Sequence, residues 1–205
     1  MAVLTEEQSM LRDAARTWVQ DKSPVTAFRK VRDSGEPLAY DPKAFAEMAE
    51  MGWAGVIIPE AYGGSEFGYL SLGLVLEETG KTLTASPLLS SALAAASAIV
   101  LGGSEDQKQN YLTQIATGEL VATLAVDEGA HHAPEKVALA ATKSGAGYTL
   151  SGEKTFVLEG MAAGLFVVSA RTSGKPGDKD GITLDRKSTR LNSSHSIASR
   201  MPSSA

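Results

Sequence analysis

The chain has no cysteine among its 205 residues, and aromatic residues make up only 6% of it. The missing cysteine excludes a disulfide framework, a zinc site built on thiolates and a catalytic thiol. An excess of positive charge is missing too, because the formal net charge is −5. Such a balance gives no electrostatic reason to expect a nucleic-acid partner. We expect a cytoplasmic protein, since the absence of cysteine suits a reducing compartment.

Long hydrophobic runs are also missing. The longest apolar stretch covers 87–101. It would form a helix of roughly 22 Å at ~1.5 Å per residue, whereas a bilayer core needs roughly 30 Å. We therefore predict no membrane span, and the N-terminus lacks the basic-then-apolar pattern of a signal peptide. The apolar fraction of 43% is enough for a hydrophobic core.

Helical patterns fill the chain up to about residue 118. Capping boxes at Thr5–Gln8 and Ser104–Gln107 predict two helix starts. Asp41 followed by Pro42 predicts a third, with Asp as the N-cap. Further helices are predicted over 69–81 and over the Ala-rich 87–101, from the spacing of their apolar residues. These elements indicate an all-α N-terminal domain over 1–118.

Short alternating segments follow, joined by Gly-containing turns at 145–147 and 151–152. This pattern is typical of antiparallel hairpins. Strands are predicted over 120–126, 137–143, 148–150, 154–158 and 165–171. The fold class is therefore α+β, with the helical domain followed by an antiparallel, β-barrel-like domain over 119–184. We expect this second domain to be truncated, because another strand begins near Leu184.

Three segments in this order resemble one enzyme family. They are GWAGVIIPEAYGG at 52–64, GELVATLAVDE at 118–128 and YTLSGEKTFVLEG at 148–160. Over roughly 4–184 the chain resembles acyl-CoA dehydrogenases, FAD enzymes that desaturate acyl-CoA thioesters. The resemblance implies a flavoprotein oxidoreductase of fatty acid metabolism and lipid catabolism. It also implies an acyl-CoA substrate, an electron-transfer flavoprotein as electron acceptor, and a homo- or hetero-oligomeric full-length protein.

The resemblance implies that the first flavin-contacting segment is a strand end, Leu-Thr-Glu-Pro in the family. It falls here on Val126, Asp127, Glu128 and Gly129. In the family, backbone amides and the threonine hydroxyl meet the isoalloxazine ring. Asp127 replaces that threonine, so we expect a negative charge that disfavours a reduced, anionic flavin.

The second implied segment is the family's Trp-Ile-Thr strand, which falls on Phe156, Val157 and Leu158. Phe156 keeps an aromatic face, whereas Leu158 lacks a hydroxyl that would bond near the flavin N5. These departures keep open a non-catalytic partner subunit of a heteromeric dehydrogenase. A plainer alternative is that Phe156 and Val126 are only core residues. A third is a helical interaction domain with a β appendage.

The residues that would perform the chemistry are not all found here. Desaturation needs a base for the α-proton while hydride leaves to the flavin. The resemblance implies that this base is a glutamate of a C-terminal helical domain absent from this chain. The catalytic residue is therefore unknown, and we do not assign the role to Glu60, Glu128 or Glu159. No metal site is predicted, because the adjacent His131 and His132 would point to opposite faces of a strand.

The composition changes abruptly at Asp185. Residues 185–205 contain few apolar side chains and show no period that would bury a face. We predict that this tail is disordered and non-native. Its first part, 185–195, reads as the translation of a common sequencing-library adapter, and 199–205 reads as the far part of the same adapter. On this interpretation the natural chain is interrupted within the β-domain, after about Leu184.

Overall fold

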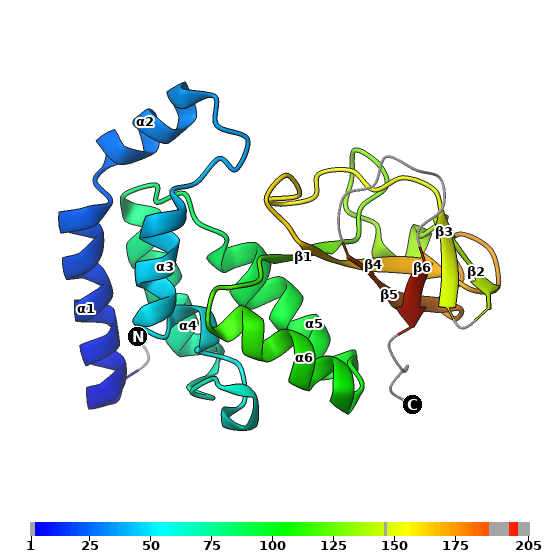
Figure 1. Ribbon diagram of the computed structural model, residues 1–205, viewed down its shortest axis with the longest axis horizontal. Helices are drawn as coiled ribbons and strands as arrows, with labels where there is room; N and C mark the ends of the chain where they lie inside the picture. The colour runs from blue at the N-terminus through cyan, green and yellow to red at the C-terminus, as the bar shows by residue number, and fades with distance from the viewer. Residues whose placement is uncertain (1–2, 146, 189–196, 201–205) are drawn as a thin grey trace.

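The computed structural model describes residues 3–145, 147–188 and 197–200. Its helices gather on one side of the molecule and its strands on the other (Figure 1). The two parts meet where the chain leaves the last helix and enters the first strand. The predicted α+β class, with helices first and strands after them, is confirmed.

The helical part forms from the segments whose caps and apolar spacing predicted it. Both capping boxes are present, with the Thr5 and Ser104 hydroxyls accepting from the amides of Gln8 and Gln107. The 25–34 helix has no such N-terminal signal, and only the left-handed Gly35 that ends it is a recognisable stop. The helical elements are α1 (Glu6–Lys22), α2 (Val25–Ser34), α3 (Pro42–Glu50), η1 (Trp53–Gly55), η2 (Glu60–Tyr62), α4 (Gly68–Lys81), the π-helical η3 (Leu88–Ala95), α5 (Ala96–Gly102) and α6 (Glu105–Ala116).

Aromatic packing and one buried acid hold the outer helices together. Trp18 of α1 packs edge-on against Trp53, with ring centroids 5.5 Å apart. Glu78 of α4 is buried and bonds Arg16 of α1 at 3.0 Å and Lys81 at 2.9 Å. Burial alone would raise the pKa of Glu78, but these two cations hold it below its ordinary value. The carboxylate therefore ties α1 to α4.

The second part is a partial mixed sheet. Its strands are β1 (Ala122–Ala125), β2 (Ala140–Ser144), β3 (Gly147–Ser151), β4 (Leu165–Arg171), β5 (Ile182–Ser188) and β6 (Ile197–Arg200). A short helical turn, η4 (Pro134–Lys136), lies between β1 and β2. The strand order is β1-β4-β2-β3-β6-β5, and β5 also pairs with β4. The β2–β3 and β4–β5 pairs are antiparallel as expected. The β1–β4 and β2–β4 pairs are parallel, so the expectation of a purely antiparallel domain is corrected.

Two further expectations are corrected by the strands. The 154–158 segment is not a strand, because Phe156 has φ +52° and breaks the extended backbone. Residues 185–188 belong to β5 and 197–200 form β6, so the predicted disorder is wrong for them. Strand pairing needs only backbone N–H and C=O groups, which polar sequences also supply along an open edge. The adapter origin of the tail stays a prediction, and 189–196 and 201–205 lie outside the described residues.

The junction between the parts is closely packed. Gly118 has φ +76°, and a Cβ there would lie 2.7 Å from the Ala49 Cβ, so both conformation and space favour glycine. Just beyond it, the amide of Ala122 donates to the buried Ser91 hydroxyl of η3 at 3.0 Å. Ala122, Leu165 and other strand residues join the helices in one hydrophobic core cluster. The first strands are therefore anchored on the helical part.

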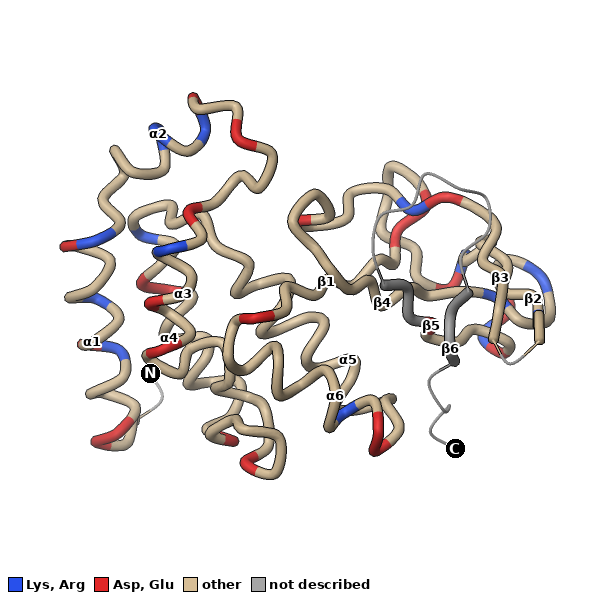
Figure 2. The backbone as a smooth tube through the Cα atoms, viewed as in Figure 1, with Lys and Arg blue, Asp and Glu red and all other residues tan. Residues whose placement is uncertain are grey.

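Charged residues do not separate by sign. Figure 2 shows acidic and basic residues on both the helical and the strand part. Several pair locally, as Arg32 does with Asp33 at 2.7 Å. Across the described residues, no helix is long and apolar enough to cross a membrane.

Ser91→Ala should destabilise the chain, because the Ala122 amide would lose its acceptor in a buried place. An unsatisfied buried donor costs about 1–3 kcal/mol. Urea unfolding followed by tryptophan fluorescence measures the loss. Ser97→Ala is the matched control, since Ser97 bonds only the exposed Tyr69 hydroxyl in the described structure. Equal stability of the two variants would contradict the anchoring role of Ser91.

Candidate functional site

The two segments expected to contact flavin lie side by side along β1 and just beyond its end. The amide of Thr155 donates to the Asp127 carbonyl at 2.8 Å. Further along, the hydroxyl of Thr123 donates to the Leu158 carbonyl at 2.7 Å. Val126 lies directly after β1, between Thr123 and Asp127. Since both of these residues are bonded to the 155–158 segment, Val126 lies next to that segment as well. The structure thus brings together two groups of residues that are about 30 positions apart in the chain.

Lys154 joins these segments from the inside. Its Nζ donates to the Val126 carbonyl at 3.0 Å, to Glu128 Oε1 at 2.7 Å and to the Ser169 hydroxyl at 2.9 Å. The Lys154 side chain is only 6% exposed. An ammonium group offers three donors, and here each has an acceptor. The sequence gives a weak signal for this role, namely a lone cation in the alternating segment after Gly152.

Glu128 is held by backbone amides as well as by this lysine. Its two carboxylate oxygens accept from the amides of Ala138 at 2.8 Å and Leu139 at 3.0 Å. Burial would raise the pKa of Glu128, but the bonds from Lys154 and the two amides outweigh it and lower the pKa. For Lys154 burial is the larger effect, and it lowers the pKa despite the attraction of Glu128. Glu128 has the additional amide donors, which explains why the carboxylate is the better-stabilised charge.

Asp127 has a partner that the sequence did not assign to it. The Asp127 Oδ1 lies 2.8 Å from the His132 Nδ1. The His132 side chain is 70% exposed, whereas that of Asp127 is 27% exposed. The histidine is therefore the more exposed partner of this pair. Among the described residues, no group of three His, Cys, Asp or Glu side chains gathers as a metal site.

The apolar members of the second segment divide between surface and interior. Phe156 is 76% exposed and Leu158 is 50% exposed. The alternative that Phe156 is a core residue is therefore wrong. Val157 instead packs, partly buried, against the strand core that contains Ala125 and Leu139. The inward Val157 holds the segment on the sheet while its two neighbours present apolar surface.

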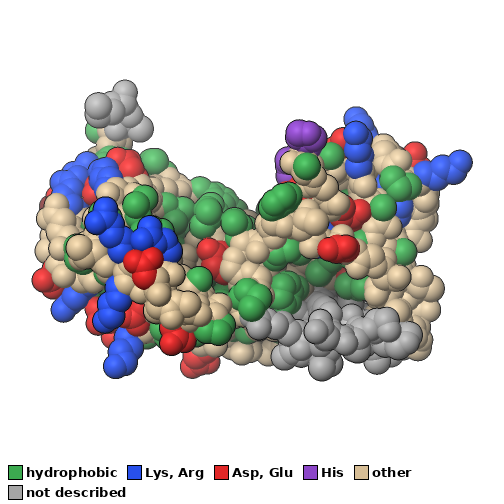
Figure 3. Space-filling model, turned by 90° about the horizontal axis from the view of Figure 1, so that it is seen from above, with side chains coloured by type: hydrophobic (Ala, Val, Ile, Leu, Met, Phe, Trp, Pro, Cys, Tyr) green, Lys and Arg blue, Asp and Glu red, His purple; other side chains and the backbone are tan. Residues whose placement is uncertain are grey.

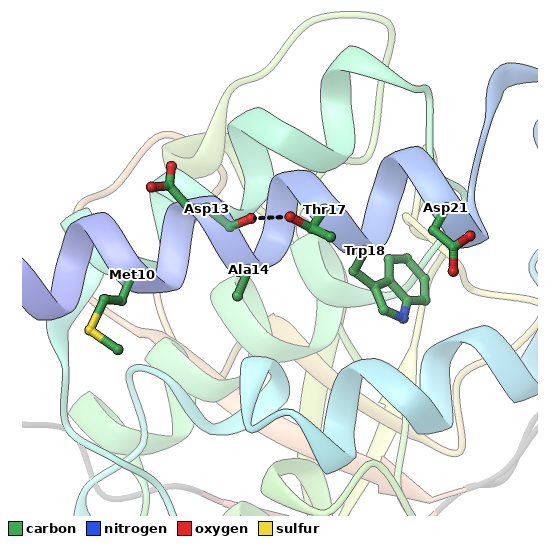
Figure 4. A pocket seen from close by; sticks show the side chains of 6 residues that line it. All are labelled: Met10, Asp13, Ala14, Thr17, Trp18 and Asp21. Carbon is green, nitrogen blue, oxygen red and sulfur yellow. Dashed lines mark hydrogen bonds between the residues drawn. The ribbon is translucent and has the colours of Figure 1, made fainter.

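A wide depression elsewhere does not have the features of a site. It lies along α1, and Figure 4 shows its residues on that one helix. The hydrogen bond drawn there runs from the Thr17 hydroxyl to the Asp13 carbonyl within the helix. Trp18 is buried among the helices and donates its ring N–H to Glu47. No second element brings a polar group to this surface among the residues that line it.

Comparisons with known proteins agree with the arrangement of helices and strands. The family model for the N-terminal domain of acyl-CoA dehydrogenases matches residues 5–119. Acryloyl-CoA reductase (NADH) of Anaerotignum propionicum is 32% identical over 180 residues, 86% of this chain and 45% of its own length. Cyclohex-1-ene-1-carbonyl-CoA dehydrogenase of Geobacter metallireducens is 32% identical over 183 residues, 87% of this chain and 47% of its own length.

A solved structure is similar over almost the whole chain. It is the ChsE4–ChsE5 complex from Mycobacterium tuberculosis, with a TM-score of 0.78 and 25% identity. The match covers 98% of this chain and 55% of that one. The chain thus spans about half the length of the curated relatives it matches.

Lys154→Met should destabilise the strand part, because it removes the bonds to Val126 and Ser169 and leaves the Glu128 carboxylate without its cation. Breaking such a buried pair costs about 3 kcal/mol, at the low end of the usual range because Glu128 keeps two amide donors. Thermal and urea unfolding measure the loss. Lys143→Met, at an exposed lysine of β2, is the control. A similar loss in both variants would show that Lys154 acts as an ordinary surface lysine.

The stability that Glu128 contributes should depend on pH in a defined direction. The folded pKa lies below the ordinary value of 4.5, so the contribution is complete above that value and is lost as the pH falls through the folded pKa. The difference in unfolding free energy between wild type and Glu128→Gln should therefore shrink below about pH 5. Glu153→Gln, at an exposed acid, should give a curve parallel to wild type. A difference that does not change between pH 3 and pH 7 would contradict the assignment.

Proposed function

Because the chain belongs to the acyl-CoA dehydrogenase family, we propose that it is part of a flavoenzyme that desaturates an acyl-CoA thioester between Cα and Cβ. The observation that carries the proposal is that the 123–127 and 155–158 segments, which include most of the residues expected at the flavin, are bonded side by side. FAD is the proposed hydride acceptor, and an electron-transfer flavoprotein the proposed partner. We place the reaction in lipid catabolism in the cytoplasm.

The described residues fit a flavin in part. Phe156 and Leu158 present exposed apolar surface next to the strand end, and a planar aromatic ring system packs well on such a surface. Lys154 and Glu128 are occupied with each other, so they support the segments and leave the contacts to their neighbours. Asp127 is the poorly fitting residue, although His132 offsets its charge when protonated. Of the six residues 126–128 and 156–158, Phe156 and Leu158 would contact the ring, whereas Glu128 and Val157 would hold their segments in place.

The chemistry divides between the cofactor and the chain. Bound FAD supplies the acceptor for the hydride that leaves the β-carbon. The residues of this chain position the ring, and their apolar faces exclude water from one side of it. The α-proton needs a base within hydrogen-bond reach. We assign that base to the portion that the relatives have beyond the matched half, so this chain alone should be inactive.

A non-catalytic partner subunit is the second candidate. Asp127 and Leu158 stand where the family's pattern has hydroxyl groups, and both changes weaken the expected support of a reduced flavin. The similar ChsE4–ChsE5 structure is a complex of two different proteins. In such an assembly this chain would complete the architecture, and its partner would carry out the oxidation. A homo- or hetero-oligomer is proposed in either case.

The test uses a chain extended to the length of its relatives. If it is an enzyme, it should bind FAD and reduce an acceptor dye with acyl-CoA. Asp127→Thr with Leu158→Thr should then raise the flavin potential by about 30–60 mV, since a hydrogen bond to a charged group is worth about 1.5–3 kcal/mol. A redox titration measures the shift.

Three outcomes separate the alternatives. An unchanged potential in the double variant would show that these residues do not contact the ring. Binding of FAD only after a homologous subunit is added would favour the partner-subunit function. Steady turnover by the 205-residue chain alone would contradict the assignment of the base to the portion that the relatives have beyond the matched half.

A further inference from the structure

A cavity of ≈ 550 Å³ lies beneath α2 and is called the α2 cavity below. Its walls come from the end of α1, from one side of α2, from 36–44 and from 84–85. A volume of this size is typical of small-molecule sites. A neighbouring cavity of ≈ 440 Å³ lies between the helical part and the strand part and borders the flavin segment at Val157. Among the described residues that line the α2 cavity, by contrast, none belongs to either expected flavin segment.

Helix α2 covers the α2 cavity without joining the core. All ten of its residues are described, and none of them is fully buried. Figure 1 shows this helix apart from the other helices. The side that lines the cavity contains Ala27, Phe28 and Val31, which are half-buried, and Pro42 and Ala44 of α3 add apolar surface. An apolar face with no packing partner leaves burial to be gained by an apolar ligand.

Two hydroxyl groups of the walls have no hydrogen-bond partner among the described residues. Ser23, at the end of α1, is only 6% exposed, and its hydroxyl is one of them. The Ser23 Oγ is not fully enclosed, so it keeps surface that a ligand can reach. The Tyr40 hydroxyl is the other, and the Tyr40 ring packs edge-on against Phe45. Burial raises the pKa of Tyr40, so its hydroxyl stays a neutral donor.

The remaining hydroxyl groups of the walls are already bonded. The Ser34 hydroxyl donates to the Val31 carbonyl at 2.7 Å, and the Thr84 hydroxyl lies 2.8 Å from that of Thr82. Polar groups in protected places are nearly always hydrogen-bonded. The contrast marks the first two hydroxyls as the groups to which a ligand would bond.

Charged side chains of both signs stand at the edge of the α2 cavity. Lys22 and Lys30 are the cations, Glu36 and Asp41 are the acids, and all four are exposed. Figure 3, which looks onto the α2 side of the molecule, shows basic, acidic and hydrophobic side chains intermixed over the helical part. An anionic ligand would meet the two acids, and a cationic ligand would meet the two lysines. The walls therefore favour an uncharged ligand over either ion.

We propose that the α2 cavity binds a small uncharged ring compound that carries an amide, carbonyl or hydroxyl group. The ring packs on Phe28 and Val31, because flat apolar rings bury much surface against such side chains. The polar group accepts from the Ser23 hydroxyl, and the Tyr40 hydroxyl offers a second donor. The inference goes beyond the proposed function, because it concerns a different ligand and walls outside the flavin segments.

The test uses three probes of similar shape on the purified 205-residue chain at neutral pH. They are benzamide, benzoate and benzylamine, followed by calorimetry and by shifts of the backbone amide signals of 23–31. Benzamide should bind saturably and more tightly than either charged probe. Ser23→Ala should weaken benzamide by about 2- to 10-fold, the usual worth of a neutral hydrogen bond. Its melting temperature should not fall, because the Ser23 hydroxyl makes no bond in the described fold. Thr26→Ala, on α2 but outside the cavity, is the matched control and should leave the affinity unchanged.

Ala27→Leu gives a second variant that leaves the hydroxyl groups in place. Ala27 is half-buried on the cavity wall, so a leucine there should fill the space, abolish binding and leave the melting temperature unchanged or higher. Weaker binding in Ser23→Ala and loss of binding in Ala27→Leu, with stability kept, support the site. Equal binding of the three probes, full affinity in either variant, or no saturable binding of benzamide would overturn it. The flavin experiment uses a longer chain and a different ligand, so either proposal can fail without the other.

Discussion

One ammonium group holds the candidate site together. Lys154 reaches back from the 152–160 segment to the carbonyl of Val126, the carboxylate of Glu128 and the hydroxyl of Ser169 on β4. Without it, two segments that make few regular backbone pairs would depend on isolated bonds such as the one from Thr155 to Asp127. A buried lysine is tolerated because all three of its donors are satisfied.

The helical part gives this arrangement a rigid base. Ser91 accepts the first amide of β1, and Ala122 and Leu165 lie in the same hydrophobic cluster as the helices. Strand β4 then links the helical part to Lys154, because its Ser169 hydroxyl accepts from the Lys154 ammonium group. The candidate site therefore lies at the point where the packing of helices on strands ends. The cavity between the parts begins there as well, because residues 37–40 and 157–161 face one another across it.

The acids of this region differ in how they are compensated. Glu128 has a cation and two amides, and Asp127 has a histidine as its partner. Glu159 has a buried oxygen with no donor among the described residues, on a strained backbone. These three acidic residues therefore differ in role, although two of them, Asp127 and Glu128, are neighbours in one expected flavin segment. Glu128 fixes the structure, Asp127 pairs with a histidine, and Glu159 keeps one buried oxygen without a donor among the described residues.

Local sequence determined much of the fold. Capping boxes at Thr5 and Ser104 predicted helix starts because the cap bonds lie within four residues. The helix–strand boundary near 118 and the family resemblance were also readable, since both depend on contiguous segments. Tertiary structure alone decided the parallel β1–β4 pairing, the irregular path around Phe156, the continuation of the strand expected near Leu184 through 185–188, and the pairing of Lys154 with Glu128. Each of these depends on groups far apart in the chain, and side-chain spacing along a sequence does not record which of them meet.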